Sequence, residues 1–333
     1  MTRRATISDV AAAANVSRAA VSKVLQGAYG VSDDMRQRVN TAIEQLNYRP
    51  LVSARGLRGA TFTFGITIPD FRNHFFSEVI RGAVEFLADT PYQLLTSPVD
   101  QGHREGYRAI EALYDRQVDG ILTISPLVET AWLEDMALRV PVVELGRHDI
   151  AKNYDVVRGD DAAGTRAVME HLFSLGHTRI AHVAQVDAEA SGADVTPPAI
   201  RRRVYEELMR DAGLAENIQI IEALYQEMSA YHATKSVIDH GLPPTAIFAG
   251  NDDAALGVLR ATAERGVDLS VCGYDDSQLA DHPLINLTSV NQHGADMGRV
   301  AMELLVERVK GRTESRVETM HPVLIARGST RPA

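Results

Sequence analysis

Residues 6–26 read TISDVAAAANVSRAAVSKVLQ and describe two short helices joined by a tight turn. Thr6 followed by Asp9 forms a capping box, which opens the first helix. Asn15 ends that helix, because asparagine tolerates the left-handed conformation that a tight turn requires. Ser17 can then cap the second helix with its hydroxyl. The stretch therefore predicts a helix-turn-helix unit.

A third helix follows and completes a small three-helix head. Ser32 can cap it, and the two carboxylates of Asp33 and Asp34 favour its positive first turn. Three apolar residues at helical spacing predict the side that packs on the first two helices: Val39, Ile43 and Leu46. An unrelated three-helix bundle would show the same pattern, so the surrounding sequence must decide between the two.

The charge of the chain is divided unevenly. The 333 residues contain 34 basic and 44 acidic side chains, which gives a net charge of −10. Residues 1–58 contain 9 of the basic and 4 of the acidic side chains, so this segment carries +5 and the remainder carries −15. A basic head on an acidic body is typical of a nucleic-acid-binding module joined to a domain with another role.

In a helix-turn-helix, the second helix enters the major groove and its N-terminal side chains face the base edges. We expect these contacts from Ser17, Arg18, Ala19, Ser22 and Lys23. Arg and Lys suit the O6 and N7 atoms of guanine, and a methyl group suits thymine. Lys23 could instead bind phosphate without reading bases. We also expect DNA contacts from Thr6, Tyr29 and Tyr48, although Tyr48 could instead pack against the third helix.

The segment NYRPLVSARGL, residues 47–57, links this head to the rest of the chain. Head and linker together resemble the lactose/galactose repressor (LacI/GalR) family of bacterial transcription regulators, and the resemblance extends to the C-terminus. It implies a hinge helix that folds only on operator DNA, with Ala54 at the DNA and Leu57 wedged into the minor groove. Such a wedge unstacks a base step and kinks the duplex. Gly56 costs about 1 kcal/mol of helix propensity, so the hinge helix should be marginal alone.

From residue 62 onward, strand-like and helix-like segments alternate in two series of similar length. The strands are short and apolar throughout, as in parallel sheets that helices cover on both faces. The expected fold class is therefore α/β, with two doubly wound parallel-sheet lobes. The family resemblance implies a periplasmic-binding-protein-like pair. The chain should cross between the lobes near 159–162, 289–292 and 321–323.

The domain bounds follow from this organisation. We expect a helix-turn-helix head over 1–48, a hinge over 49–60, and an effector-binding and dimerisation body over 61–330. Lobe 1 should take about 61–160 and 291–321, and lobe 2 about 161–290 and 322–330. The helix expected over about 296–309 then belongs to lobe 1.

Ligands of open α/β sheets bind beyond the carboxyl ends of the strands, so two facing lobes form a cleft lined by strand-end loops. Polar and aromatic residues occupy these positions and the second crossing: Asp70, Asn73, Phe75, Phe76, Ser125, Gln185, Tyr225, Asn251, Asp275 and Gln292. Carboxylates and amides pair with vicinal hydroxyls, and aromatic rings stack on the C–H face of a sugar. The set therefore predicts a polyhydroxylated ligand.

Two segments match signature motifs of the family, FAGNDDAALG at 248–257 and CGYDD at 272–276. Arg201, followed four residues later by Tyr205, matches an arginine–aromatic pair on a cleft helix. In sugar-responsive members these matches imply that Arg201, Asn251 and Asp275 hold the hydroxyls.

Plainer roles stay open for several of these residues. Asp252 could only cap its helix, and Asp275 could only accept backbone hydrogen bonds. Phe75 and Phe76 could belong in part to the hydrophobic core.

Several other site types have no support in the sequence. No G-x-G-x-x-G follows a strand and no G-x-S-x-G elbow occurs. His171, His177 and His182 are spaced too widely for a helical metal motif, and we expect them at the surface or at helix ends. Cys272, the one cysteine, excludes an internal disulfide and is expected to be inert core. No apolar run reaches the roughly 20 residues of a membrane span, and no signal-peptide core is present, so we expect a cytoplasmic protein.

These observations predict a homodimeric, sequence-specific transcriptional repressor that binds palindromic double-stranded operator DNA. A small sugar-like effector in the cleft should control it, with no cofactor and no enzymatic activity. The alternatives are a soluble sugar-binding protein without a gene-regulatory role, and a sugar-active enzyme. The basic head counts against the first, and the missing nucleophile and metal motifs count against the second. The chain shows no heptad tail that would support a coiled-coil tetramer.

Overall fold

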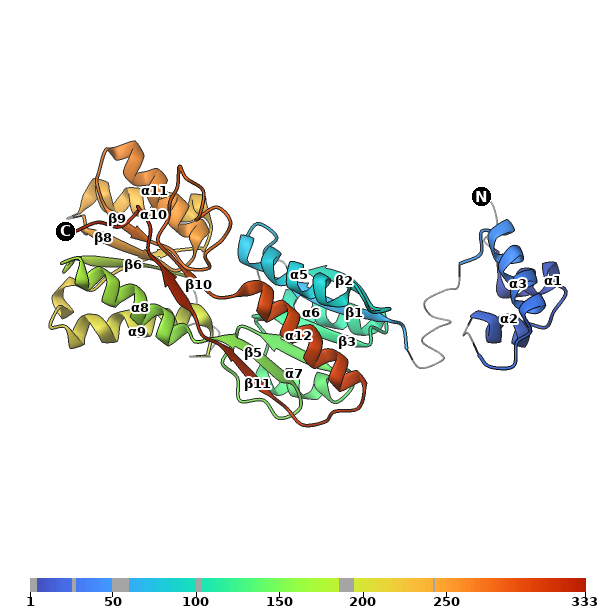
Figure 1. Ribbon diagram of the computed structural model, residues 1–333. Helices are drawn as coiled ribbons and strands as arrows, with labels where there is room; N and C mark the ends of the chain where they lie inside the picture. Colours follow the sequence, from blue (N-terminus) through green and yellow to red (C-terminus); the bar gives the residue numbers. More distant parts are fainter. Residues whose placement is uncertain (1–4, 26–27, 50–59, 100–102, 186–194, 242) are drawn as a thin grey trace. The chain divides into compact units, whose positions relative to one another are not determined.

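The computed structural model describes residues 5–25, 28–49, 60–99, 103–185, 195–241 and 243–333 (Figure 1). The chain divides into two compact units, Met1–Thr61 and Phe62–Ala333, which we call the head and the body. Within the described residues, no helix has both the length and the apolar character that crossing a membrane requires.

The head consists of the helices α1 (Ile7–Ala13), α2 (Arg18–Leu25) and α3 (Asp33–Gln45). Thr6 and Asp9 form the expected capping box at the start of α1. Asn15 has a φ of 50°, in the left-handed region, as the turn requires. Ser17 and Ser32 each accept a backbone N–H three residues further on. The local pattern of the helix-turn-helix is therefore confirmed.

A small apolar core holds the three helices together. Val10, Val21 and Val39 are fully buried, one from each helix. The expectation that Leu46 extends the apolar stripe of α3 is wrong, because the helix ends at Gln45 and the Leu46 side chain at its C-cap is 36% exposed.

Lobe 1 of the body is built on a six-stranded sheet in which every pairing is parallel. Its spatial order is β11-β5-β4-β3-β1-β2, with β1 (Thr63–Ile68), β2 (Gln93–Pro98), β3 (Gly120–Ile124), β4 (Val142–Leu145), β5 (Asp155–Gly159) and β11 (Val317–Met320). Helices α5 (His74–Leu87) and α12 (Gly294–Val309) cover one face and lie side by side in Figure 1. Helices α6 (His103–Asp115) and α7 (Thr130–Ala137) cover the other.

Lobe 2 repeats this design with a four-stranded parallel sheet. Its order is β7-β6-β8-β9, with β6 (Ile180–Gln185), β7 (Gln219–Ala223), β8 (Ala246–Ala249) and β9 (Ser270–Cys272). Helices α8 (Asp161–Ser174) and α9 (Pro197–Asp211) pack on one face, and α10 (Glu227–His240) and α11 (Asp252–Arg265) on the other. A short 3₁₀ turn, η1 (Ala215–Asn217), follows α9.

The chain passes between the lobes at three places. The first is the step from β5 to α8. The others are the strands β10 (Ser289–Asn291) and β12 (Val323–Ile325), which pair antiparallel and connect lobe 2 to α12 and to β11. These are the segments in which the sequence placed the crossings, and the α/β fold with two doubly wound lobes is confirmed.

Two parts of the body differ from the sequence prediction. Helix α7 was not foreseen. Strand β2 forms the edge of the lobe 1 sheet. Leu95 in its middle is 36% exposed, so helices do not cover this strand fully on both faces.

The histidines near β6 are also placed differently. His182 is fully buried in β6, where its ring stacks on Phe248 with centroids 4.5 Å apart and its Nδ1 donates to the Phe248 carbonyl oxygen at 2.9 Å. His177 is buried as well and contacts Thr245 and Ser270. His171 lies in the last turn of α8, at a helix end as expected. The expectation of a surface or helix-end position is wrong for His182, and His177 follows α8 but is not at the surface, because residues distant in sequence supply their partners.

Burial lowers the pKa of His182 to about 4. An unfolded histidine has a pKa near 6.5, so between these values only the unfolded state binds the proton. The stability that neutral His182 contributes is therefore present above pH 6.5 and is lost as the pH falls toward 4. We therefore expect His182 to lower the free energy of unfolding of the parent protein by about 2 kcal/mol between pH 7 and pH 5.

Urea unfolding of the full chain at several pH values, compared with His182→Gln, measures this effect. The glutamine cannot titrate, so the variant should show a shallower pH dependence. Some slope should remain, since burial also lowers the pKa of His171 and His177. An identical pH dependence in parent and variant would contradict the assignment.

Candidate functional site

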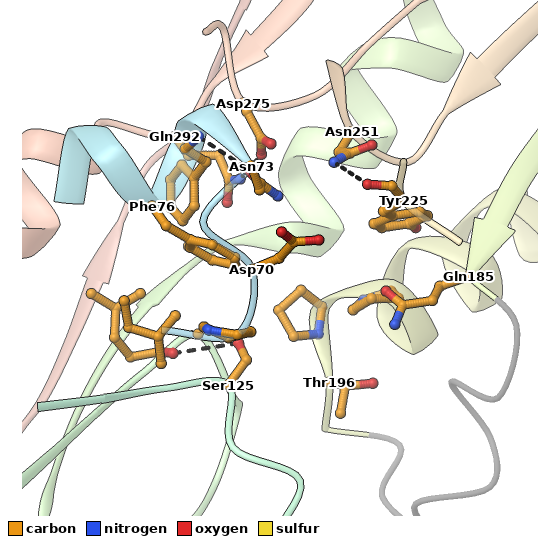
Figure 2. Close-up of a pocket in the computed structure, with 18 of the residues that line it drawn as sticks. Asp70, Asn73, Phe76, Ser125, Gln185, Thr196, Tyr225, Asn251, Asp275 and Gln292 are labelled. Atoms are coloured by element: carbon orange, nitrogen blue, oxygen red, sulfur yellow. Dashed lines mark hydrogen bonds between the residues drawn. The ribbon is translucent and has the colours of Figure 1, made fainter. Parts of the chain in front are cut away.

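The side chains that the sequence assigned to the effector lie around one cavity of about 460 Å³ (Figure 2). Its lining includes all of Asp70, Asn73, Phe75, Phe76, Ser125, Gln185, Arg201, Tyr225, Asn251, Asp275 and Gln292. They come from the carboxyl ends of strands in both lobes, and the volume falls in the usual range of small-molecule sites. Their role in binding stays a prediction.

The wall that lobe 1 contributes is mainly apolar, with Ile124, Leu145 and Met297 behind the two phenylalanines of α5. Phe75 is 9% exposed and belongs to the lobe 1 core, whereas Phe76 is only partly buried. Their rings meet edge to face with centroids 5.8 Å apart. Phe76 is therefore the ring that can reach a ligand, and Phe75 holds it in place.

The polar groups of lobe 1 are already engaged. Asp70 accepts two hydrogen bonds from the Arg72 guanidinium, at 2.9 and 2.7 Å, and these bonds lower its pKa. Asn73 caps α5 by accepting the Phe75 N–H at 2.9 Å. Each side chain keeps capacity for a ligand, because a carboxylate or amide oxygen accepts more than one hydrogen bond.

The wall of lobe 2 is polar, and its centre is Arg201 on α9. Its guanidinium is 4% exposed and forms a 2.8 Å ion pair with Asp161. It also donates to the Gly250 carbonyl oxygen at 2.6 Å and lies 3.7 Å above the centroid of the Tyr274 ring. Arg201 is thus a buried anchor that borders the cavity.

Tyr205, its partner in the family motif, points the other way. The Tyr205 hydroxyl donates to the Ile180 carbonyl oxygen at 2.6 Å inside the core of lobe 2. The arginine therefore faces the cleft and the tyrosine stabilises the lobe behind it.

Asn251 takes the helix-cap role that the sequence left open for Asp252, and it also lines the cavity. Asn251, not Asp252, caps α11, since its Oδ1 accepts the Ala254 N–H at 2.9 Å. Asp252 is buried and accepts hydrogen bonds from the Ser277 N–H and the Ser289 hydroxyl. Burial raises its pKa to about 6 despite these bonds. Asp252 thus ties the start of α11 to β10, at a crossing between the lobes.

Asp275 is held in an unusual backbone conformation at the edge of the cavity. Its φ is 114°, which a side-chain-bearing residue adopts only under constraint. Its N–H donates to the Val290 carbonyl oxygen, and its carboxylate accepts the Gln292 amide at 2.5 Å (Figure 2). Burial raises the pKa of Asp275 well above its usual range, and Arg201 opposes that effect. Ligand hydroxyls that donate to this carboxylate would favour its ionised form.

Two hydroxyl groups at the cavity are buried and lack acceptors within the described residues. Tyr225 donates its hydroxyl to none of them, and its backbone carbonyl accepts the Asn251 amide at 3.3 Å. Thr196 precedes α9 but makes no side-chain cap. A buried hydroxyl without a partner is unfavourable, so both groups are suited to bind a polar ligand.

Three side-chain contacts join the lobes beside the cavity among the described residues, and one is His148 Nε2 of lobe 1 with the Asp161 carboxylate of lobe 2 at 2.9 Å. His74 of α5 lies 3.1 Å from the Asp253 carboxylate of α11. Gln226 donates to Asp70 at 3.3 Å. These contacts tie the two lobes to each other at the edge of the cavity.

Three polar lining residues escaped the sequence analysis: Asp161, Thr196 and Gln226. Asp161 follows β5 directly, so the strand-end rule that found Asp275 could have found it too. Gln226 comes directly after Tyr225 beyond β7, so the same rule could have included it. Thr196 follows no clear strand signal, and only the folded arrangement brings it to the cavity.

The cysteine and the side chains that could bind a metal ion indicate no further site among the described residues. Cys272 is fully buried in β9, as expected for core, and burial raises its pKa. Among the described residues, no three His, Cys, Asp or Glu side chains are grouped as a metal ion would need.

In the head, the residues assigned to DNA mostly lie on an exposed surface. Ser17, Arg18, Ala19 and Lys23 are exposed, and Ser22 is half-buried. Thr6 and Tyr29 are also exposed. Tyr48 is half-buried against the head core, which agrees with the packing role left open for it. Ala54 and Leu57 lie outside the described residues.

Comparisons with known proteins agree with this architecture. Residues 6–50 match the model of bacterial regulatory proteins of the lacI family, and residues 169–330 match a periplasmic binding protein-like domain. The chain is 31% identical over 337 residues to the ribose operon repressor of Escherichia coli K12, covering 98% of this chain and 99% of that protein.

Two solved structures are similar along the whole chain. The Lac repressor dimer bound to operator and the anti-inducer ONPF has a TM-score of 0.82 and 26% identity, covering 99% of this chain and 100% of that one. The complex of the transcriptional regulator CelR with cellobiose has a TM-score of 0.70 and 28% identity, covering 98% and 100%.

The burial of Arg201 generates a stability prediction. Arg201→Ala removes the guanidinium from the buried Asp161 carboxylate, which keeps the His148 ring at 2.9 Å, so the free energy of unfolding should fall by about 3–5 kcal/mol. Arg202→Ala on the same helix is the matched control. Arg202 is 25% exposed in its pair with Glu206, and its loss should cost less than about 1 kcal/mol. Urea unfolding of both variants measures these changes. Equal, small losses of unfolding free energy would contradict the assignment of Arg201 as a buried anchor.

Proposed function

The chain belongs to the lacI family of bacterial regulatory proteins, and from this premise we propose that it is a sequence-specific transcriptional repressor. It binds a palindromic operator as a homodimer, and a small sugar in the cavity of the body controls that binding. The observation that carries the proposal is the pairing of an exposed basic helix-turn-helix with a cavity that collects the predicted sugar-binding side chains.

The head supports DNA binding through its charge and the surface of α2. Arg18, Ala19 and Lys23 are exposed on this helix, and α2 contains no acidic side chain. A guanidinium can donate two hydrogen bonds to one guanine, and the alanine methyl can contact thymine. The net charge of +5 over residues 1–58 adds sequence-independent attraction to phosphate.

The cavity supports a sugar effector. Amide, hydroxyl and carboxylate groups of lobe 2 can pair with vicinal hydroxyls, and Phe76 can cover the C–H face of a sugar ring. The relatives agree, since one is named a ribose operon repressor and another was solved with cellobiose.

The geometry indicates how a bound sugar could act on DNA. Asp275 and Gln292 both border the cavity, and Gln292 lies where the chain leaves β10 for lobe 1. A ligand that binds Asp275 and Gln292 on one side and packs against Phe76 of lobe 1 on the other would favour one relative position of the lobes. Such a ligand shifts the equilibrium only by its difference in affinity for the two positions.

Homodimer formation is supported by apolar side chains left exposed on lobe 1. Val84 on α5 is 51% exposed, and Leu95 lies on the edge strand β2. Exposed apolar edges are normally covered, and a second copy would cover this one while placing two heads for a palindromic site. The similar Lac repressor was solved as a dimer on its operator.

We propose no enzymatic activity and a location in the cytoplasm, where operator DNA is accessible. The chain bounds for head, hinge and lobes, and the roles of Ala54 and Leu57 in the hinge, are part of this proposal. A sugar-binding protein without a regulatory role remains the alternative, and it would show no sequence-specific binding to DNA.

Base reading by Arg18 tests the DNA-binding half of the proposal. Arg18→Ala should cost about 1–3 kcal/mol on the cognate duplex and relax the preference at one position in each half-site. Fluorescence anisotropy on cognate and scrambled duplexes measures both effects. Arg36→Ala on α3 is the control, because it removes the same charge outside the recognition helix. Equal weakening on both duplexes by Arg18→Ala would make Arg18 a phosphate contact only.

A further inference from the structure

We propose that the cavity selects uncharged polyhydroxylated ligands and rejects their phosphorylated or acidic counterparts. This inference rests on the proposed sugar effector and narrows its chemical class. It is drawn from the charges at the cavity, from the helix ends that face it, and from the groups left free to bind.

Three carboxylates, Asp70, Asp161 and Asp275, border the cavity, and among the described lining residues Arg201 is the one lysine or arginine. Asp70 is paired with Arg72 and Asp161 with Arg201, so Asp275 is the carboxylate whose charge is left for a ligand to meet. Arg201 is already used, because its guanidinium pairs with Asp161, donates to the Gly250 carbonyl oxygen and covers Tyr274. The cation therefore has little left to offer a phosphate.

The helix ends at the cavity are also unsuited to anions. A helix N-terminus binds phosphate through free backbone N–H groups and its positive dipole end. At α9 the first two residues, Pro197 and Pro198, have no N–H to donate.

Carboxylates neutralise three further helix ends. Asp161 lies in the first turn of α8, Glu227 in that of α10, and Asp252 and Asp253 in that of α11. The start of α5 carries no carboxylate, but Asn73 already accepts its Phe75 N–H. The starts of α8, α9, α10 and α11 therefore lack the free donors or the positive field that an anion needs.

The groups that remain suit hydroxyls instead. The hydroxyls of Tyr225 and Thr196 are buried with no acceptor among the described residues, and Asp275 offers a carboxylate that only accepts hydrogen bonds when ionised. A sugar hydroxyl can donate to Asp275 and accept from Tyr225. A phosphate oxygen can only accept, and at an ionised Asp275 it would meet a like charge.

Matched pairs of ligands test the proposal by calorimetry on the full chain. The probes are ribose with ribose 5-phosphate, glucose with glucose 6-phosphate and gluconate, and cellobiose with cellobionate. In the pair that binds best, the neutral sugar should bind at least about thirtyfold tighter than its anionic partner, because like charges at a partly buried site repel strongly.

Asp275→Asn should bring this ratio at least about threefold closer to one, since it removes one repelling charge. Asparagine tolerates a positive φ better than most residues, so the variant should fold. The control is Asp115→Asn, the same chemical change at the last residue of α6, which should leave the ratio unchanged. If Asp275 were only structural, both affinities would fall and their ratio would stay the same.

The outcomes separate this inference from the proposed function. An anionic sugar that binds as tightly as its neutral partner would overturn the charge selection and leave the sugar effector intact. If no member of the panel bound, the sugar effector would fall, and this inference with it.

Discussion

The buried ion pair between Arg201 and Asp161 holds together the region where the chain changes lobes. Asp161 opens α8 directly after the first crossing, and Arg201 comes from α9. The same guanidinium reaches the end of β8 at Gly250. It lies 3.4 Å from the Gln292 side-chain oxygen, beside the second crossing. Burying two charges is costly unless every partner is present, so this pair requires the four segments to meet in one arrangement.

This constraint explains why the cavity has two different walls. Lobe 2 must supply polar partners for its buried charges, and the same polar groups border the cavity. Lobe 1 keeps a buried ion pair, Arg147 with Asp149, outside the cavity lining and presents Phe76 and aliphatic side chains to the cavity. A ligand with a ring of hydroxyls and one apolar face would satisfy both walls at once. It would also connect the two lobes, as the contact between Gln226 and Asp70 does.

The sequence predicted the parts of the molecule that depend on local rules. Capping residues such as Thr6 and Ser32 act within one helical turn, and the strand-end rule found Asp275 and Gln185 because parallel strands all end at the same edge. It could not assign hydrogen-bond partners that are distant in the chain. The hydrogen bond of the Asn251 amide to the Tyr225 carbonyl oxygen, the burial of His182 and the inward direction of Tyr205 all depend on segments more than 20 residues away.

The central claim is that a ligand in the body and DNA at the head are coupled. Coupling between two binding sites is reciprocal, so the factor by which a sugar changes operator affinity must equal the factor by which the operator changes sugar affinity. Both can be measured at one salt concentration, by anisotropy with and without sugar and by calorimetry with and without duplex. The account predicts equal factors that differ clearly from one. A sugar that binds the body with the same affinity in the presence and absence of operator would contradict it.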